Sequence, residues 1–200
     1  SIVRIIIPSS VVKIGEYSFA CCEELKNVDF AKNSNLTIIE REAFASSSIV
    51  KFSVPPKVTQ IGEYAFSDCE NLKSVDFPTE CKVTKIEREL FSNSAIERIL
   101  IPKNVTEIDE FAFYECKSLT VVGFSQNSQL CSIDCYAFSS TPIESISLPS
   151  KVKYVGIYSF SNCANLASFK VANDSDSCMV YRESFKLSPL KEVSFSNEVV

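Results

Sequence analysis

The most reactive side chains in this 200-residue chain are its nine cysteines. Histidine is absent, which removes the commonest general base and the commonest ligand of metal ions. Cys131 and Cys135 have the spacing of half a zinc site, but no second pair and no histidine completes four ligands. A nucleophilic cysteine would also lack a histidine base. The sequence therefore predicts no catalytic residue, no metal site, no cofactor site, and a protein that is not an enzyme.

Two other motifs carry little weight. The chain has only four glycines, and they form no phosphate-binding loop. Asn35, Asn104 and Asn173 begin N-x-S/T sequons for glycosylation. Three sequons are close to the chance number in a chain rich in asparagine and serine, so they are weak evidence for secretion.

The composition is that of an ordered protein with a mixed surface. Apolar residues make up 46% of the chain, which is enough for a core and excludes disorder. The net charge is −5 and no long basic run occurs, so no nucleic-acid partner is expected. No apolar run approaches the length of about 18 residues that a membrane span needs, so this segment is not expected to insert into a membrane.

The elements that position these residues follow from an internal repeat. One series of phenylalanines recurs every 47 residues, and a second series with the same period is interleaved with it. The first series is Phe19, Phe66, Phe113 and Phe160, and the second is Phe44, Phe91, Phe138 and Phe185. Because the offsets are 25 and then 22 residues, each period holds two related rungs. Rungs open at Ile2, Leu25, Ile49, Leu72, Ile96, Leu119, Ile143, Leu166 and Leu190.

Each rung predicts one strand followed by a turn. The opening segment has apolar residues at alternate positions, such as Ile146 and Leu148, which is the period of a strand with one buried face. Isoleucine and phenylalanine then follow five residues apart, as in Ile86 and Phe91, which favours a short helical or 3₁₀ turn. One strand per rung, always entered from the same side, predicts a parallel sheet. A phenylalanine in every rung predicts a continuous aromatic core.

The repeat also determines how most cysteines are interpreted. One repeat position, three residues after a phenylalanine, is occupied by Cys22, Cys69, Cys116 and Cys163. Alternate rungs have serine or threonine there, so the position requires a small residue. Equivalent positions two rungs apart are separated by roughly 10 Å, beyond the limit of about 7 Å between the Cα atoms of a disulfide. The same geometry excludes a bond between Cys131 and Cys178, and the sequence predicts free, buried thiols.

Three strings in the first kind of rung resemble a known repeat family. IGEYSFACC (Ile14–Cys22), IGEYAFSDC (Ile61–Cys69) and IDEFAFYEC (Ile108–Cys116) are similar to the BspA-type, or Treponema-type, leucine-rich repeat. The resemblance covers the whole chain. It implies a surface or secreted protein of anaerobic bacteria or mucosal parasitic protozoa that adheres to host cells, matrix proteins or other microbes. The chain departs from the pattern at Asp109, at Phe111 and in the polar loop 173–177.

The repeat and the resemblance together predict the fold class. We expect an α/β repeat solenoid, a right-handed leucine-rich-repeat superhelix with a parallel sheet on its concave face and short helical, 3₁₀ or irregular convex segments. A single domain spans residues 1–200, with eight full rungs of about 23 residues and part of a ninth. Both ends stop inside the repeat without a capping segment, which predicts a piece of a longer array or end-to-end self-association.

Function is expected at the exposed positions of the strands, which lie between the buried ones. Most of these side chains are small and polar, but Leu100 and Val121 form an apolar spot beside Arg98. This composition is typical of an interface hot spot. The alternative is that two exposed aliphatic residues on a sheet have no function. The predicted partner-binding surface on the concave face consists of Arg98, Leu100, Val121, Gly123, Lys51 and Asp76.

The favoured function is a non-enzymatic protein-binding module, an adhesin-type protein that is secreted or held at the cell surface. Its expected partner is a host-surface or extracellular-matrix protein. The alternative is a cytoplasmic leucine-rich-repeat scaffold, which the free thiols would suit. No signal peptide is visible in the chain, so these residues do not decide between the two compartments.

Overall fold

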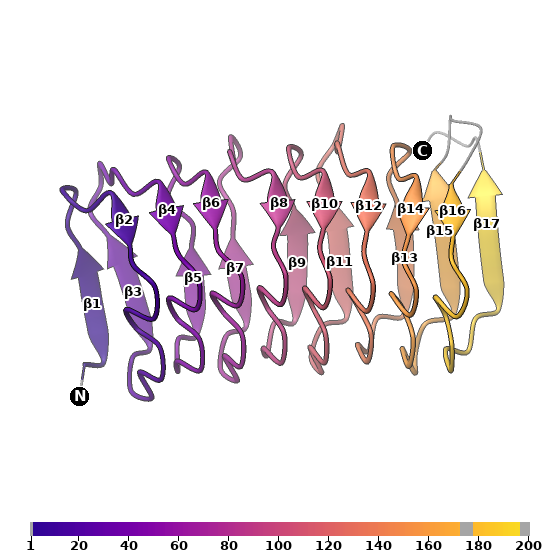
Figure 1. Ribbon diagram of the computed structural model, residues 1–200, viewed down its shortest axis with the longest axis horizontal. Helices are drawn as coiled ribbons and strands as arrows, with labels where there is room; N and C mark the ends of the chain where they lie inside the picture. Colours follow the sequence, from indigo (N-terminus) through magenta and orange to yellow (C-terminus); the bar gives the residue numbers. More distant parts are fainter. Residues whose placement is uncertain (1, 173–177, 197–200) are drawn as a thin grey trace.

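The chain forms a parallel β-solenoid of about eight turns (Figure 1). The structure is a computed structural model that describes residues 2–172 and 178–196. Within these residues each complete turn contributes one longer strand and one two-residue strand, and no helix is present. The predicted polar loop 173–177 and the sequon at Asn173 lie outside the described residues.

The longer strands lie side by side on one face, which we call the long-strand face (Figure 1). They pair in parallel, with Arg4 opposite Asn27 and Lys51 opposite Ser74. Exposed and buried residues alternate along them, so the predicted parallel sheet is confirmed. The strands are β1 (Arg4–Ile7), β3 (Asn27–Phe30), β5 (Lys51–Ser53), β7 (Ser74–Asp76), β9 (Arg98–Ile101), β11 (Val121–Phe124), β13 (Ser145–Leu148), β15 (Ser168–Ala172) and β17 (Glu192–Ser196).

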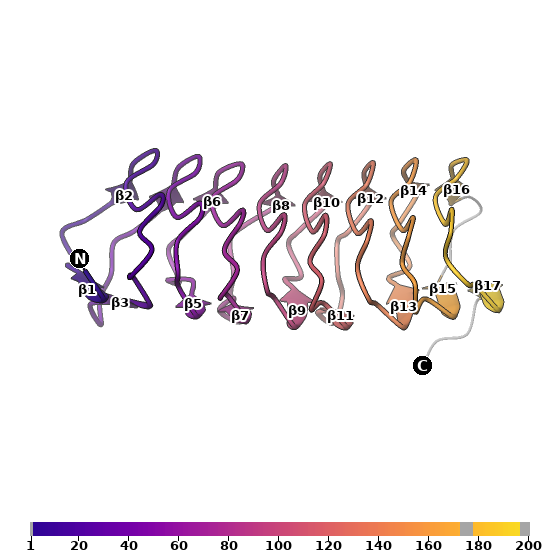
Figure 2. The same cartoon turned by 90° about the horizontal axis from the view of Figure 1, so that it is seen from below.

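A second parallel ladder, made of two-residue strands, lies on the opposite face, which we call the short-strand face (Figure 2). Most of these strands end on a fully buried aliphatic residue, such as Ile86 or Val155, which attaches the ladder to the core. They are β2 (Lys13–Ile14), β4 (Ile38–Ile39), β6 (Gln60–Ile61), β8 (Lys85–Ile86), β10 (Glu107–Ile108), β12 (Ser132–Ile133), β14 (Tyr154–Val155) and β16 (Met179–Val180).

The segment after each short strand is not helical, so the prediction of helical or 3₁₀ turns was wrong. Two residues per rung, four positions apart, adopt left-handed backbone angles there, for example Tyr64 (φ 58°) and Asp68 (φ 54°). Left-handed residues interrupt a right-handed helix. The hydrogen bonds run between rungs, because the N–H groups of Tyr64 and Phe66 donate to the carbonyls of Arg88 and Leu90. The spacing of isoleucine and phenylalanine therefore reflects another inter-rung ladder.

The stack is close to straight, because its two faces run nearly parallel (Figure 2). A leucine-rich-repeat solenoid curves when helices about 10 Å wide on one side are matched to strands about 4.8 Å apart on the other. Here both faces are hydrogen-bonded strand ladders, which share one spacing. The long-strand face, predicted to be concave, is therefore nearly flat.

The repeat phenylalanines form the core, as the sequence predicts. Rings in adjacent rungs stack, and the centroid of Phe113 lies 5.3 Å from that of Phe91 and 5.0 Å from that of Phe138. Each ring therefore contacts both neighbouring rungs, and the core is continuous along the solenoid. The fully buried members of the two series are Phe44, Phe66, Phe91, Phe113, Phe138 and Phe160.

The repeat position that is occupied by cysteine or serine, three residues after a core phenylalanine, forms hydrogen bonds between adjacent rungs. The Cys116 thiol donates to the carbonyl of Phe91 in the preceding rung at 3.0 Å and lies 3.5 Å from the Ser94 hydroxyl. In an alternate rung the Ser188 hydroxyl donates to the carbonyl of Phe160 at 2.7 Å. The position therefore favours a small hydrogen-bond donor, which explains why either cysteine or serine can occupy it.

The nine cysteines are unpaired thiols, but the prediction that they are buried holds only for Cys69, Cys81, Cys116 and Cys163. Burial raises the pKa of Cys69 to about 11 and that of Cys116 to about 12, so the reactive thiolate is scarce at neutral pH. Cys21 and Cys131 are exposed.

We expect iodoacetamide to alkylate Cys21 and Cys131 in the native protein, and to alkylate the buried Cys69 and Cys116 only after unfolding. Peptide mass spectrometry measures the labelling at each position. Equal native labelling at all four positions would show that the cysteine position is open to solvent.

Candidate functional site

The apolar spot expected from the sequence is present at the centre of the long-strand face. Arg98 and Leu100 on β9 lie opposite Val121 and Gly123 on β11. The Leu100 side chain is 58% exposed and Val121 is 54% exposed. A Cβ atom at Gly123 would lie 3.3 Å from Leu100 Cδ1, so the bare backbone lets Leu100 lie across β11. Among the described residues, Arg98 has no carboxylate within ion-pair distance.

The other two predicted residues form an ion pair on the same face. Lys51 on β5 and Asp76 on β7 lie in adjacent rungs, with 2.7 Å between Nζ and Oδ2. Both side chains are more than half exposed, so the pair contributes little to the free energy of unfolding. Asp76 borders the hollow that also contains Arg98, Leu100, Val121 and Gly123, so five of the six predicted residues line one hollow. Lys51 lines the neighbouring hollow instead and reaches this group only through its ion pair with Asp76.

A hollow of about 750 Å³ begins at the apolar spot and extends to the loops at the carboxyl ends of the strands. Its wall includes Phe77 and Pro78 from one rung and Pro102 and Lys103 from the next. Sequence reasoning missed these loop residues, because it considered only the strand positions.

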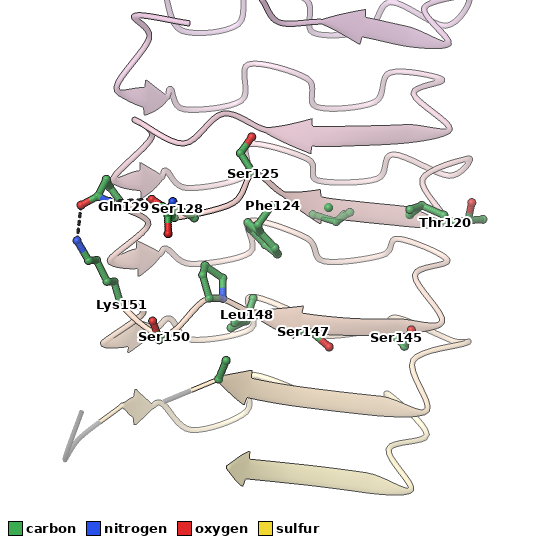
Figure 3. Close-up of a pocket in the computed structure, with 16 residues that line it drawn as sticks. Thr120, Phe124, Ser125, Ser128, Gln129, Ser145, Ser147, Leu148, Ser150 and Lys151 are labelled. Atoms are coloured by element: carbon green, nitrogen blue, oxygen red, sulfur yellow. Dashed lines mark hydrogen bonds between the residues drawn. The ribbon is translucent and has the colours of Figure 1, made fainter. Parts of the chain in front are cut away.

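Two further hollows occupy equivalent places one 47-residue period away in each direction. In chain order, the first hollow, of about 670 Å³, lies between the rungs of β3 and β5 and is lined by Phe30 and Pro55. The hollow at the apolar spot is the second. The third, of about 830 Å³, lies between the rungs of β11 and β13, where Figure 3 shows Phe124 beside Leu148. The site is therefore one of a series.

The hollows recur because long and short loops alternate along this edge. Five residues separate Phe30 from the next core leucine, Leu36, whereas three separate Val54 from the next core valine, Val58. The long loops therefore extend past the short ones. The strand ladder is also interrupted between the two rungs that line each hollow. β3 pairs with β5 at a single position, β7 and β9 belong to different sheets, and so do β11 and β13.

A cluster of carboxylates on the short-strand face is a second feature that sequence reasoning missed. Ligand oxygens of Glu107, Asp109 and Asp134 lie within 4.8 Å of one another. Lys85 Nζ lies 3.0 Å from Glu107 and 2.8 Å from Asp109. Partial burial alone would lower the pKa of Lys85, but these two bonds hold it above its usual value. Since an ammonium group already neutralises part of the cluster, the arrangement is that of a structural ion-pair network.

Asp134 is the member of this cluster without an ion pair among the described residues. Burial, followed by repulsion from Glu107 and Asp109, raises its pKa to about 6. The unfolded-state pKa is about 3.9, so ionising Asp134 costs stability as the pH rises from about 4 to about 6, and the full cost is present at neutral pH. Discounted for the partial exposure of the group, this cost is on the order of 1 kcal/mol.

Asp134→Asn is therefore expected to raise the Tm by about 2–4 °C at neutral pH and to leave it unchanged near pH ~4. Differential scanning calorimetry at the two pH values measures both shifts. The same shift at both pH values would mean that the substitution acts through packing and that ionisation of Asp134 carries no cost.

Parallel rungs of this pattern, with a stacked core and an exposed strand face, define a leucine-rich-repeat solenoid. More specifically, the chain belongs to the family of the BspA type leucine rich repeat region, of which six copies match over residues 1–120 and 84–200. The resemblance found in the sequence is thus confirmed. No curated protein matches the sequence.

Two solved structures share the fold. A leucine-rich repeat protein from Bacteroides ovatus is 24% identical with a TM-score of 0.71, and the match covers 96% of this chain. The chain spans 60% of the length of that protein. A leucine rich cell surface protein from Faecalibacterium prausnitzii is 20% identical with a TM-score of 0.52, and the match covers 98% of this chain and 79% of that one. Within the described residues, no helix is long and apolar enough to cross a membrane.

Proposed function

We propose that this protein is a non-catalytic protein-binding module whose partner contacts the long-strand face at Arg98, Leu100 and Val121. The observation that carries the proposal is an exposed aliphatic pair beside an unpaired guanidinium at the edge of a hollow. An arginine next to apolar side chains that a partner can desolvate is the arrangement found at interface hot spots. The ion pair of Lys51 and Asp76 lies at the rim of this surface, where it orients the partner more than it adds affinity.

We further propose that the protein is secreted or held at the cell surface and acts as an adhesin toward host cells, matrix proteins or other microbes. The Faecalibacterium prausnitzii neighbour is described as a cell surface protein, which supports this location. A cytoplasmic scaffold is the second candidate, and the nine unpaired thiols favour it, because such thiols persist in a reducing compartment.

The proposed site is tested by replacing its two central side chains. Leu100→Asp and Arg98→Glu are each expected to weaken binding to epithelial surfaces or immobilised matrix proteins by about 30-fold or more, which corresponds to about 2 kcal/mol. Neither side chain is part of the core, so the midpoint of urea unfolding is expected to stay within experimental error.

Met179→Asp is the matched control, because Met179 on the short-strand face is an exposed apolar residue with 55% exposure, close to that of Leu100. It is expected to bind like the unmodified protein. Normal binding by Leu100→Asp together with loss of binding by Met179→Asp would place the partner on the short-strand face and contradict the proposal.

A further inference from the structure

The three hollows form a row with a fixed repeat along the solenoid axis. Their aromatic residues are 47 residues apart: Phe30 and Phe124 end β3 and β11, and Phe77 directly follows β7. All three rings are half-buried against the core and leave part of their surface at the hollow. Adjacent strands of a ladder are about 4.8 Å apart. The stacked core rings of adjacent rungs are 5.0 to 5.8 Å apart. Equivalent points in successive hollows, two rungs apart, are therefore about 10 Å apart. A ligand that fills the row must repeat at nearly this distance.

Each hollow pairs its phenylalanine with a proline from the next rung. The pairs are Phe30 with Pro55, Phe77 with Pro102 and Phe124 with Pro149. Pro55 and Pro102 are buried and Pro149 is half-buried, so the partly exposed phenylalanine ring is the main ring surface that a ligand can contact. Aromatic-lined grooves bind proline-rich segments, because such segments are already ordered and lose little entropy on binding. The chemistry of each hollow therefore favours a proline side chain as its occupant.

The row is positively charged, although the chain as a whole has a net charge of −5. Six basic residues and three acidic ones line the three hollows. The acidic residues Asp29, Asp76 and Glu80 form ion pairs with Arg4, Lys51 and Lys103, so two of the six basic residues are already neutralised. Lys57 and Lys151 instead donate to the side-chain amide oxygens of Asn35 and Gln129, which leaves their charge uncompensated among the described residues. A complementary ligand carries carboxylates between its prolines.

We propose that this row binds an acidic, proline-rich segment of a partner protein in the polyproline II conformation, with a proline in each hollow. A polyproline II helix has three residues per turn and rises about 3.1 Å per residue, so every third side chain returns to the same face after about 9.3 Å. This distance is within about 1 Å of the spacing of the hollows. A β-strand does not fit, because residues three apart in a strand point to opposite faces. The inference rests on the proposed function, since it names the partner segment.

The test uses two nine-residue peptides of identical composition, both with blocked ends. One is (Pro-Pro-Glu)₃, which has the three-residue repeat, and the other is the block peptide Pro₆Glu₃, which does not. Fluorescence anisotropy with the full chain is expected to give a Kd at least tenfold lower for the repeating peptide. Equal affinity for the two peptides, or no binding of either, would overturn the proposal.

Charge reversal at the rim tests the same contact from the side of the protein. The triple variant Lys57→Glu, Lys103→Glu and Lys151→Glu is expected to bind the repeating peptide at least tenfold more weakly. The control triple variant Lys26→Glu, Lys73→Glu and Lys117→Glu changes three exposed lysines outside the hollows by the same charge. It is expected to bind within about threefold of the unmodified protein, because distant exposed charges are screened by salt. An equal loss in both triple variants would show attraction by net charge alone and overturn the proposal.

The polyproline inference and the proposed function can be contradicted independently of each other. A protein partner that requires Leu100 while neither peptide binds would overturn the polyproline inference and leave the proposed function in place. Selective binding of the repeating peptide, combined with a protein partner that is insensitive to Leu100→Asp, would support the polyproline site and contradict the placement of the main contact at Leu100.

Discussion

A protein that lacks residues 72–118 is expected to fold, whereas one that lacks residues 72–106 is expected to be largely unfolded under the same conditions. The first deletion removes one full period of 47 residues and joins Asn71 to Leu119, so that a new rung begins where the old one did. β5 would then pair with β11, and Phe66 would stack on Phe138. The nearest-neighbour contacts on which a solenoid depends are preserved in type.

The 35-residue deletion joins Asn71 to Glu107, which belongs to the short strand β10. Every later residue then arrives on the wrong face, and the buried positions no longer coincide with apolar side chains. Circular dichroism and urea unfolding distinguish the two proteins. Equal tolerance of both deletions would contradict a stack whose register is set by the 47-residue period.

Phe113→Ala is expected to lower the free energy of unfolding by about 3–5 kcal/mol. The ring is fully buried and stacks on Phe91 and Phe138, whose positions are fixed by their own rungs. The cavity cannot close by local collapse, because the backbone on both sides is tied by inter-rung hydrogen bonds, such as that from the Phe113 N–H to the Ala137 carbonyl.

Urea unfolding of Phe113→Ala and of Tyr17→Ala provides the measurement and its control. Tyr17 is also an aromatic residue of the turn, but it is 51% exposed, so its loss is expected to cost less than about 1 kcal/mol. A cost below about 1 kcal/mol for Phe113→Ala would mean that the ring contributes little to the core.

The long-strand face and the core could be predicted because their signals, alternation within a strand and recurrence at a fixed period, are both visible in the sequence. Alternating apolar residues identify a strand, and residues such as Phe113 recur at one position in every period. The exposure of Leu100 and Val121 follows directly from that alternation. The sequence also predicted that the position of Cys116 requires a small residue, although not the hydrogen bond to the Phe91 carbonyl that explains the choice.

The turns after the short strands could not be predicted from the same signals. Left-handed backbone angles usually reveal themselves through glycine, yet here residues such as Tyr64 and Glu89 adopt them. The Tyr64 N–H donates to the Arg88 carbonyl, and the Glu89 N–H donates to the Glu110 carbonyl. Hydrogen bonds to the next rung compensate the local strain and are not visible in any single rung.

The carboxylate cluster and the hollows also depend on contacts between rungs. Asp109 and Asp134 each follow the buried residue of a short strand, so they share one repeat position, and an alignment of the rungs would have revealed them. The distances to Lys85, which settle how the cluster is neutralised, required coordinates. The hollows arise because long and short loops alternate. This alternation is present in the sequence, but only the structure shows that it brings Phe77 and Pro102 into the wall of one hollow.

Hydroxyl-radical footprinting with and without a bound matrix protein tests most directly whether the long-strand face is the binding site. Leu100 and Val121 are 58% and 54% exposed on that face, whereas Met179 and Tyr181 are 55% and 42% exposed in the segment that contains β16. We predict that saturation with the partner lowers the oxidation of Leu100 and Val121 at least threefold and leaves Met179 and Tyr181 unchanged. Protection of Met179 and Tyr181 with undiminished oxidation of Leu100 and Val121 would contradict the account.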